Sequence, residues 1–314
     1  MSTAIGIDVG GSSLRAALVD ENGKILRAQR RSLGERTPTA ILDQLQALFM
    51  SLSVDDAGLP IGMGLAGFIR LDSGVVTVAP NLGWRDVPFG EMLADRFKRR
   101  VRLVNDLDAI TVGEARCGAG RGADNVVCVF VGTGVGMGAV VHGRVLEGHG
   151  GTATELGHIK IASVADGRPC GCGERGCLEA YTSGRHLPDL LTAQATGGMK
   201  TRLVDEVCGD LKALTAERIE AAAGDGDEAA LALWRDVTGH LGRAIGNVVT
   251  LFNPRVLILG GGVLNAAASL RQKVAAEIGI YAGKQQLADL EIRESELGDH
   301  AGLVGAGLLA HQSR

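Results

Sequence analysis

A short glycine motif that occurs twice, about 120 residues apart, constrains the fold of this chain more than any other feature. Val9-Gly10-Gly11-Ser12 is matched by Val131-Gly132-Thr133-Gly134, and each copy lies between two apolar runs. A second pair of similar turns follows, Gly23-Lys24-Ile25-Leu26 and Gly143-Arg144-Val145-Leu146. Unrelated glycine hairpins can also look alike, so chance similarity stays open as an alternative. The reading that explains both pairs is an internal duplication, in which each half contributes a glycine hairpin.

The apolar periodicity predicts an α/β fold. Short apolar runs, typical of buried strands, alternate with longer segments of helical periodicity. Strands are expected at residues 4–9, 13–19, 25–30, 61–66, 101–104 and 256–259, with two more inside 126–141, and helices at 39–52, 90–98, 228–251 and 303–311. Strands first, then helix–strand alternation, indicate mixed sheets flanked by helices.

Length and composition favour two folded domains. The chain has 314 residues, a size at which a single hydrophobic core usually stops growing. Its 47 glycines are about twice the ordinary share, but only 7 prolines accompany them, which argues against a disordered or collagen-like chain. A hinge is expected near residues 106–122, where a glycine-rich run precedes the second copy of the motif.

Charge and targeting signals restrict the partners and the location. The net charge is −4 and no long basic run is present, so nucleic acid is not an expected partner. The N-terminus lacks the basic and apolar regions of a signal peptide, and the most apolar stretch, 126–141, is broken by glycines and short for a bilayer span. We therefore expect no membrane association and a cytoplasmic location.

The first glycine turn is a candidate phosphate site. Gly10 and Gly11 let the backbone approach an anion closely, and successive N–H groups in such a turn, ending at Ser12, bind phosphate. Asp8, at the end of the preceding strand, is suited to hold hydrated Mg²⁺ against that phosphate. An ordinary tight turn is the alternative.

Two further glycine runs are candidate nucleotide contacts. The run that begins Gly132-Thr133-Gly134 resembles a dinucleotide fingerprint, but it precedes a strand rather than a helix, which favours a hairpin turn around phosphate. Gly260-Gly261-Gly262 follows a buried strand and leaves room for a flat adenine–ribose unit. A strand-to-helix loop with unusual backbone angles explains the second run equally well.

Asn105-Asp106 ends a predicted strand and is the candidate catalytic pair. A carboxylate in this place suits a general base that takes a proton from an attacking hydroxyl. Acidic residues here also cap helices, so Asp106 or Asp108 could serve only that purpose.

His158, Cys170, Cys172 and Cys177 form the most specific chemical signal. Three thiolates and one imidazole are a complete tetrahedral set for structural Zn²⁺, and three of the six cysteines fall within eight residues. Three buried thiols that bind no metal are the alternative. A zinc ion with four protein ligands would be structural and would fix the loops that carry Glu155 and Glu179. Glu155 and His158 also suit hydrogen bonding to neighbouring sugar hydroxyls, unless Glu155 is merely a solvated surface residue.

Residues 170–181, CGCGERGCLEAY, resemble the signature of the ROK family of sugar kinases and sugar-responsive repressors. The family's other segments follow in the same order, at 8–12, 64–67, 80–84, 105–106, 132–134, 155–158, 260–262 and 301–307. The resemblance covers essentially the whole chain. It implies a hexokinase/actin-like ATPase fold, with two α/β domains around a cleft. The domains implied are a small N-terminal one of residues 1–114 plus 302–314, and a larger C-terminal one of residues 115–301 with the zinc-binding loop.

The same resemblance implies roles for the candidate residues. Asp106 would be the base that deprotonates the sugar hydroxyl. The sugar would be held by Gly67, Asn81, Asn105, Asp106, Glu155, His158 and Glu179. ATP with Mg²⁺ would contact Asp8, Gly10, Gly11, Ser12, Gly132, Thr133, Gly134, Gly261 and Gly262. His158 would serve both the zinc ion and the sugar.

One departure from the family pattern concerns the first turn. The family commonly has Thr-Lys where this chain has Ser12-Ser13, so the lysine is missing, and Arg15 is the nearest candidate to supply its charge. The family's repressors carry a winged-helix segment before the sugar domain, and we expect none here because the first predicted strand begins at residue 4. A non-catalytic sugar sensor would be expected to lack Asp106.

The expected function is therefore that of an ATP-dependent hexose kinase acting on a sugar 6-hydroxyl, with glucose as the preferred expectation. Kinases for N-acetylmannosamine, N-acetylglucosamine or fructose are the alternatives within the family, and polyphosphate is an alternative phosphoryl donor. The resemblance also implies a homodimer or homotetramer.

Overall fold

The computed structural model describes residues 2–52 and 58–312, which form two compact units. Unit 1 comprises residues 1–126, 138–154 and 295–314, and unit 2 comprises residues 127–137 and 155–294. The chain thus passes between the units four times. The unit boundaries differ from the domain boundaries expected from the sequence, which are 114/115 and 301/302. The domain boundaries stay a prediction.

Unit 1 is built on a five-stranded mixed sheet of order β3-β2-β1-β4-β8. Its strands are β1 (Thr3–Val9), β2 (Ser13–Asp20), β3 (Ile25–Ser32), β4 (Ile61–Leu65) and β8 (Val101–Asn105). The β1–β2 hairpin is antiparallel and pairs Asp8 with Arg15, whereas β4 is parallel to both β1 and β8. The carboxyl ends of β1, β4 and β8 therefore share one edge of the sheet.

The helices of unit 1 cover this sheet. They are α1 (Pro38–Ser51), α2 (Phe89–Phe97), α3 (Asp106–Cys117) and α12 (Ala301–His311), with a short 3₁₀ turn at Gly298–His300. A separate three-stranded sheet contains β5 (Phe68–Arg70), β6 (Val75–Ala79) and β7 (Trp84–Val87). Apolar residues of α1 and of the central strands, such as Leu45, Leu48, Ile5 and Ile7, are fully buried in the core.

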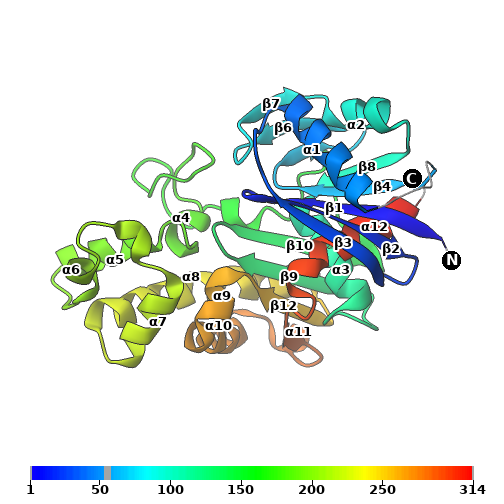
Figure 1. The fold of residues 1–314 in the computed structure, drawn as a ribbon. Helices are drawn as coiled ribbons and strands as arrows, with labels where there is room; N and C mark the ends of the chain where they lie inside the picture. Colours follow the sequence, from blue (N-terminus) through cyan, green and yellow to red (C-terminus); the bar gives the residue numbers. More distant parts are fainter. Residues whose placement is uncertain (1, 53–57, 313–314) are drawn as a thin grey trace. The chain divides into compact units, whose positions relative to one another are not determined.

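The helix α12 (red in Figure 1) is buried along its whole length from Ala301 to Ala310 and packs on β1 and α3. This packing brings backbones together, because glycines line both sides of the contact. A Cβ atom on Gly305 would lie 1.7 Å from the Ala109 carbonyl oxygen, and one on Gly62 would lie 1.8 Å from that of Ala306. Part of the glycine surplus thus serves helix packing.

Unit 2 holds most of the second sheet, whose order is β11-β10-β9-β12-β13. Its strands are β9 (Val126–Val131), β10 (Val135–Val141), β11 (Arg144–Val145), β12 (Val256–Gly260) and β13 (Glu291–Glu294). The last part of β10 and all of β11 are assigned to unit 1. In both sheets the first three strands are neighbours in chain order, and the third of them lies at one edge. The two later strands follow on the other side of the first strand. This shared order supports the internal duplication.

Helices make up most of the rest of unit 2. They are α4 (Glu179–Thr182), α5 (Leu187–Thr196), α6 (Leu203–Glu206), α7 (Ala216–Gly224), α8 (Glu228–Phe252), α9 (Gly262–Ala266), α10 (Ala268–Tyr281) and α11 (Lys284–Leu287), with 3₁₀ turns at Leu156–His158 and Leu211–Ala213. The 25-residue α8 begins where the Asp227 side chain accepts a hydrogen bond from the Ala230 N–H. In the described ranges, no helix combines the length and the apolar character needed to cross a bilayer.

Candidate functional site

Asp8 lies at the end of β1, with its carboxylate mostly buried against the start of α12. Oδ2 is 3.1 Å from the Arg15 Nη2, and a Cβ on Gly302 would lie 3.3 Å from the Asp8 Cγ. Burial raises the pKa of Asp8, the Arg15 guanidinium opposes that rise, and the Asp299 carboxylate adds to it. The Asp8 carboxylate is therefore held in a fixed place beside one cation.

The turn after Asp8 is joined to the loop that carries Asn81 by a residue that the sequence analysis did not single out. Arg36 donates from Nη1 to the Asn81 carbonyl (2.7 Å) and from Nη2 to the Gly11 carbonyl (3.0 Å). The Trp84 Nε1 in turn donates to the Arg36 carbonyl at 2.6 Å. Gly11 and Asn81 are thus neighbours, although no local sequence signal connects them.

Asn105 and Asp106 mark the junction of β8 and α3. The Asn105 side chain accepts the Leu107 N–H at 2.8 Å and donates from Nδ2 to the Gly67 carbonyl at 3.1 Å. Asn105 is therefore the N-cap of α3, which corrects the alternative that Asp106 or Asp108 plays that part. Gly67 itself admits no side chain, because a Cβ there would lie 2.6 Å from the Val78 carbonyl oxygen.

The Asp106 carboxyl has a perturbed acidity. Burial raises its pKa to about 6, and the negative charge of Asp8 contributes to the rise, while the backbone N–H of Leu107 moderates it. The Asp106 Oδ1 accepts that N–H at 3.0 Å. A carboxyl group with a pKa near 6 is mostly ionised at neutral pH and is a stronger base than an ordinary aspartate.

In unit 2, the β9–β10 turn is tied to Glu179. The Gly132 N–H donates to the Gly134 carbonyl (2.9 Å), and the Glu179 Oε2 accepts the Val135 N–H (2.9 Å). A Cβ on Gly134 would lie 2.5 Å from that Glu179 oxygen, so a glycine is needed there. The exposed Thr133 lies at the tip of the turn, and its carbonyl accepts the Arg185 N–H.

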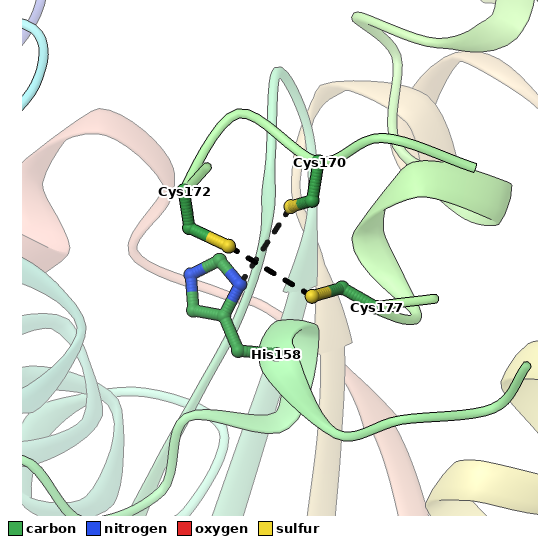
Figure 2. Close-up of side chains that lie close together, drawn as sticks. All are labelled: His158, Cys170, Cys172 and Cys177. Carbon is green, nitrogen blue, oxygen red and sulfur yellow. Dashed lines mark hydrogen bonds between the residues drawn. The ribbon is translucent and has the colours of Figure 1, made fainter. Parts of the chain in front are cut away.

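The predicted metal ligands come together as a cluster. One ligand atom each of His158, Cys170, Cys172 and Cys177 lies within 4.8 Å of all the others, and Figure 2 shows the four side chains pointing toward one another. The Cys172 and Cys177 sulfurs are 3.8 Å apart. Zinc–sulfur bonds of about 2.3 Å in a tetrahedron give a sulfur–sulfur distance of about 3.8 Å, so the cluster fits such an ion.

The loop around this cluster depends on its glycines and on a lysine that the sequence analysis missed. Gly173 and Gly176 have positive φ angles of 93° and 76°, which residues with side chains rarely adopt. The Lys160 Nζ lies 3.0 Å from the Cys177 sulfur and forms an ion pair with Glu174. Its charge therefore faces a thiol of the cluster.

His158 presents different partners to its two ring nitrogens. Nδ1 is 3.9 Å from the Cys170 sulfur, while Nε2 is 4.0 Å from the Glu155 Oε2. The Glu179 Oε1 is 3.7 Å from the same Cys170 sulfur. Glu155, His158 and Glu179 are thus grouped around the cysteine loop, as the sequence analysis expected.

The third glycine run ends β12 beside the β9–β10 turn. Gly261 has a φ of 93°, and a Cβ on it would lie 2.5 Å from the Val131 carbonyl oxygen. Gly262 begins α9, and no atom lies within 4 Å of the place its Cβ would take. Gly261 is therefore required for packing, while Gly262 borders open space.

The sequence-predicted residues fall into two groups, one on each unit. Unit 1 carries Asp8, Gly10, Gly11, Ser12, Gly67, Asn81, Asn105 and Asp106, and unit 2 carries Gly132, Thr133, Gly134, Glu155, His158, Glu179, the three cysteines, Gly261 and Gly262.

A family model described as the ROK family matches residues 4–313. The chain belongs to the ROK family.

Known proteins similar to this ROK chain match it over nearly its full length. The glucokinase of Thermotoga maritima is 34% identical over 304 residues, covering 96% of this chain and 95% of the relative. The glucokinase of Streptomyces coelicolor is 32% identical, covering 99% and 98%. A solved ROK glucokinase from Streptomyces griseus, in complex with glucose and AMPPNP, superposes with a TM-score of 0.81 at 32% identity, covering 99% and 100%. The chain thus has the hexokinase/actin-like fold of the ROK glucokinases.

Proposed function

We propose that this ROK-family chain is an ATP-dependent hexose kinase that phosphorylates the 6-hydroxyl of glucose. It is a glucokinase-like sugar kinase, a phosphotransferase, because glucokinases match it over nearly their whole length. The observation that carries the reaction is Asp106, a carboxylate at the start of α3 whose raised pKa suits a general base. Asp106 takes the proton of the sugar hydroxyl as the oxygen attacks the terminal phosphorus of ATP.

The sugar is held by hydrogen bonds rather than by stacking. Its hydroxyls are assigned to Asn81, Asn105, Glu155, His158 and Glu179, with the backbone near Gly67. The Asn105 Nδ2 is already engaged with Gly67, so the two act as a unit. Carboxylates and amides that converge on one ligand discriminate between neighbouring hydroxyl groups by donor and acceptor pattern.

The nucleotide is assigned to the glycine turns of both units. The Gly10 and Gly132 N–H groups donate within their own turns, to the Ser13 and Gly134 carbonyls, so the remaining N–H groups of Gly11, Ser12, Thr133 and Gly134 are assigned to phosphate. Gly261 and Gly262 are assigned to the adenosine. Asp8 is suited to hold Mg²⁺ through water, and the ion would supply positive charge to the transferred phosphoryl group. In place of the absent lysine, two arginines lie beside this turn: the Arg15 guanidinium is bound to Asp8, and the Arg36 guanidinium donates to the Gly11 carbonyl.

The cysteine cluster is assigned to structural Zn²⁺. All four tetrahedral positions are filled by side chains, so the ion would have no open position for a reacting group. With Nδ1 of His158 facing the thiols, the ring is oriented so that Nε2 and Glu155 can serve the sugar.

Steady-state kinetics on a panel of sugars test the substrate assignment. Glucose, mannose, fructose, N-acetylglucosamine and N-acetylmannosamine are each offered with ATP, and glucose also with polyphosphate. We expect the highest kcat/KM for glucose with ATP. A higher value for an N-acetylated sugar or for fructose would assign the chain to one of the alternative ROK kinases, and no turnover would favour a sugar sensor. The expected homodimer or homotetramer is tested by light scattering after size-exclusion chromatography.

A further inference from the structure

Glu114 is a buried carboxylate of unit 1 that belongs to none of the predicted sites. It lies on α3, about two turns beyond Asp106, and its side chain is fully buried. A charged group in such a place is costly unless hydrogen bonds satisfy it. Its oxygens accept four hydrogen bonds, from Ala119 N (2.9 Å), Ser295 Oγ (2.6 Å), Glu296 N (3.2 Å) and Leu297 N (2.9 Å).

These donors lie on two connections that run between the units. Ala119 follows α3 on the segment that leads to β9, where the chain leaves unit 1 after residue 126. Ser295 is the first residue after the chain returns to unit 1 for the second and last time. One side chain therefore binds both the outgoing and the returning connection to the same helix.

The local sequence is fitted to this arrangement. A Cβ on Gly118 would lie 2.1 Å from the Glu114 Oε2, so any larger residue there displaces the carboxylate. The backbone carbonyl of Glu114 also accepts the N–H groups of Gly118 (3.1 Å) and Gly120 (2.9 Å). Outside this contact, Arg121 and Glu296 form an exposed ion pair at 3.2 Å between the same two connections.

The returning connection continues directly to the surroundings of Asp8. The Asp299 carbonyl accepts the Arg15 Nη1 at 2.8 Å, and its carboxylate is 3.4 Å from the same nitrogen. Gly302 then packs against the Asp8 carboxylate. The hydrogen bonds from residues 295–297 to the Glu114 carboxylate thus fix this segment relative to α3, the helix that begins with Asp106.

We propose that Glu114 is a positioning residue for phosphoryl transfer. Its carboxylate clamps the outgoing and returning connections to α3 and keeps Asp8, Arg15 and Asp299 in register with Asp106. The inference rests on the proposed function, since that function assigns Asp8 and Asp106 to the reaction.

The test compares Glu114→Gln and Gly118→Ala with two control variants. Gln keeps the size of Glu114 but places an NH₂ group against N–H donors, and Gly118→Ala moves the carboxylate without removing it. Leu48→Ala destabilises the same unit from a buried site on α1, and Gly239→Ala adds a methyl group on α8 where no atom lies within 4 Å. Kinetics are measured at a fixed interval below each Tm, together with amide hydrogen exchange.

For both clamp variants we expect kcat to fall about tenfold, because Asp8 and Asp106 would be held less precisely for phosphoryl transfer, with the KM for glucose within about twofold. The Ala119, Glu296 and Leu297 amides should exchange about tenfold faster. Leu48→Ala should lower the Tm yet keep the wild-type kcat. A wild-type kcat in both clamp variants, or unchanged exchange of those three amides, would overturn the proposal. Amide exchange can be measured without turnover. A wild-type chain that lacks kinase activity would therefore refute the proposed function, while the exchange of the three amides would still test the clamp.

Discussion

The Arg15 guanidinium lies 3.1 Å from the Asp8 carboxylate, and the two residues face each other across the β1–β2 hairpin. Both side chains are mostly buried, so water screens this ion pair less than a surface pair. Arg15 also contacts Asp299, which precedes α12. The cation thus joins the hairpin to the segment before the buried helix.

Replacing Arg15 with Ala should lower kcat/KM for ATP by about tenfold or more, because the buried Asp8 carboxylate would lose its counter-charge. The KM for glucose should change little. Arg30→Ala is the matched control, since Arg30 is exposed and pairs with Arg15 in the β2–β3 register. Steady-state kinetics with varied ATP measure both variants, and equal effects would contradict a specific part for Arg15.

Replacing Asp106 with Asn should reduce kcat by about 100-fold or more, the usual contribution of a general base, while glucose still binds. Binding is measured by calorimetry. Asp108→Asn changes the other acid in the first turn of α3 and controls for helix-terminus effects. If Asp106→Asn turned over at a near-normal rate, the base assignment would be wrong.

The raised pKa of Asp106 predicts opposite effects of pH on activity and stability. The kcat/KM should fall as pH drops through about 6, because the base becomes protonated. A raised carboxyl pKa favours the folded state when protonated, so this contribution is present below the ordinary value near 3.8 and is lost as pH rises through about 6. Asp106→Asn should therefore raise the Tm at pH 8 more than at pH 4, as calorimetry at both values can show.

The cysteine cluster predicts about one zinc ion per chain. Cys177→Ser should lose most of the metal and lower the Tm, and it should weaken glucose binding because Glu155, His158 and Glu179 surround the same loop. Elemental analysis and thermal unfolding measure the two effects. Cys208→Ser, at an exposed thiol outside the cluster, should retain zinc. A purified wild-type chain with well under one zinc ion would refute the four-ligand assignment.

The close packing of α12 predicts a severe effect of a single methyl group. Gly305→Ala places a Cβ 1.7 Å from the Ala109 carbonyl oxygen and should destabilise the chain by about 3 kcal/mol or more. Gly239→Ala, in open space on α8, should stabilise it by up to about 1 kcal/mol. Chemical denaturation of both variants tests this contrast.

Local patterns in the sequence predicted the elements that carry the site. The strand predicted at residues 101–104 is β8 (Val101–Asn105), and the helix predicted at 228–251 is α8 (Glu228–Phe252). The clustering of His158 with the three cysteines was also predictable, because close spacing and ligand chemistry together leave few arrangements. These features depend on periodicity and on residues near one another in the chain.

Contacts between distant segments were not predictable in this way. Arg36 joins Gly11 to Asn81, and Glu114 joins Ala119 to residues 295–297, yet neither residue belongs to a motif. Some glycines are needed for close helix packing rather than for ligand binding. Gly62 and Gly305 lie at backbone contacts of α12, which a composition count cannot separate from ligand-binding turns.

The burial of α12 against β1 also determines the order in which the chain can fold during synthesis. Every residue of unit 2 emerges from the ribosome before α12, and only then can that helix pack on β1, β4 and α3 of unit 1. The unit that begins first is therefore completed last. Until α12 has been synthesised, the sheet of unit 1 exposes the apolar, glycine-lined surface that this helix covers, and such transiently exposed surface makes a nascent chain prone to aggregation.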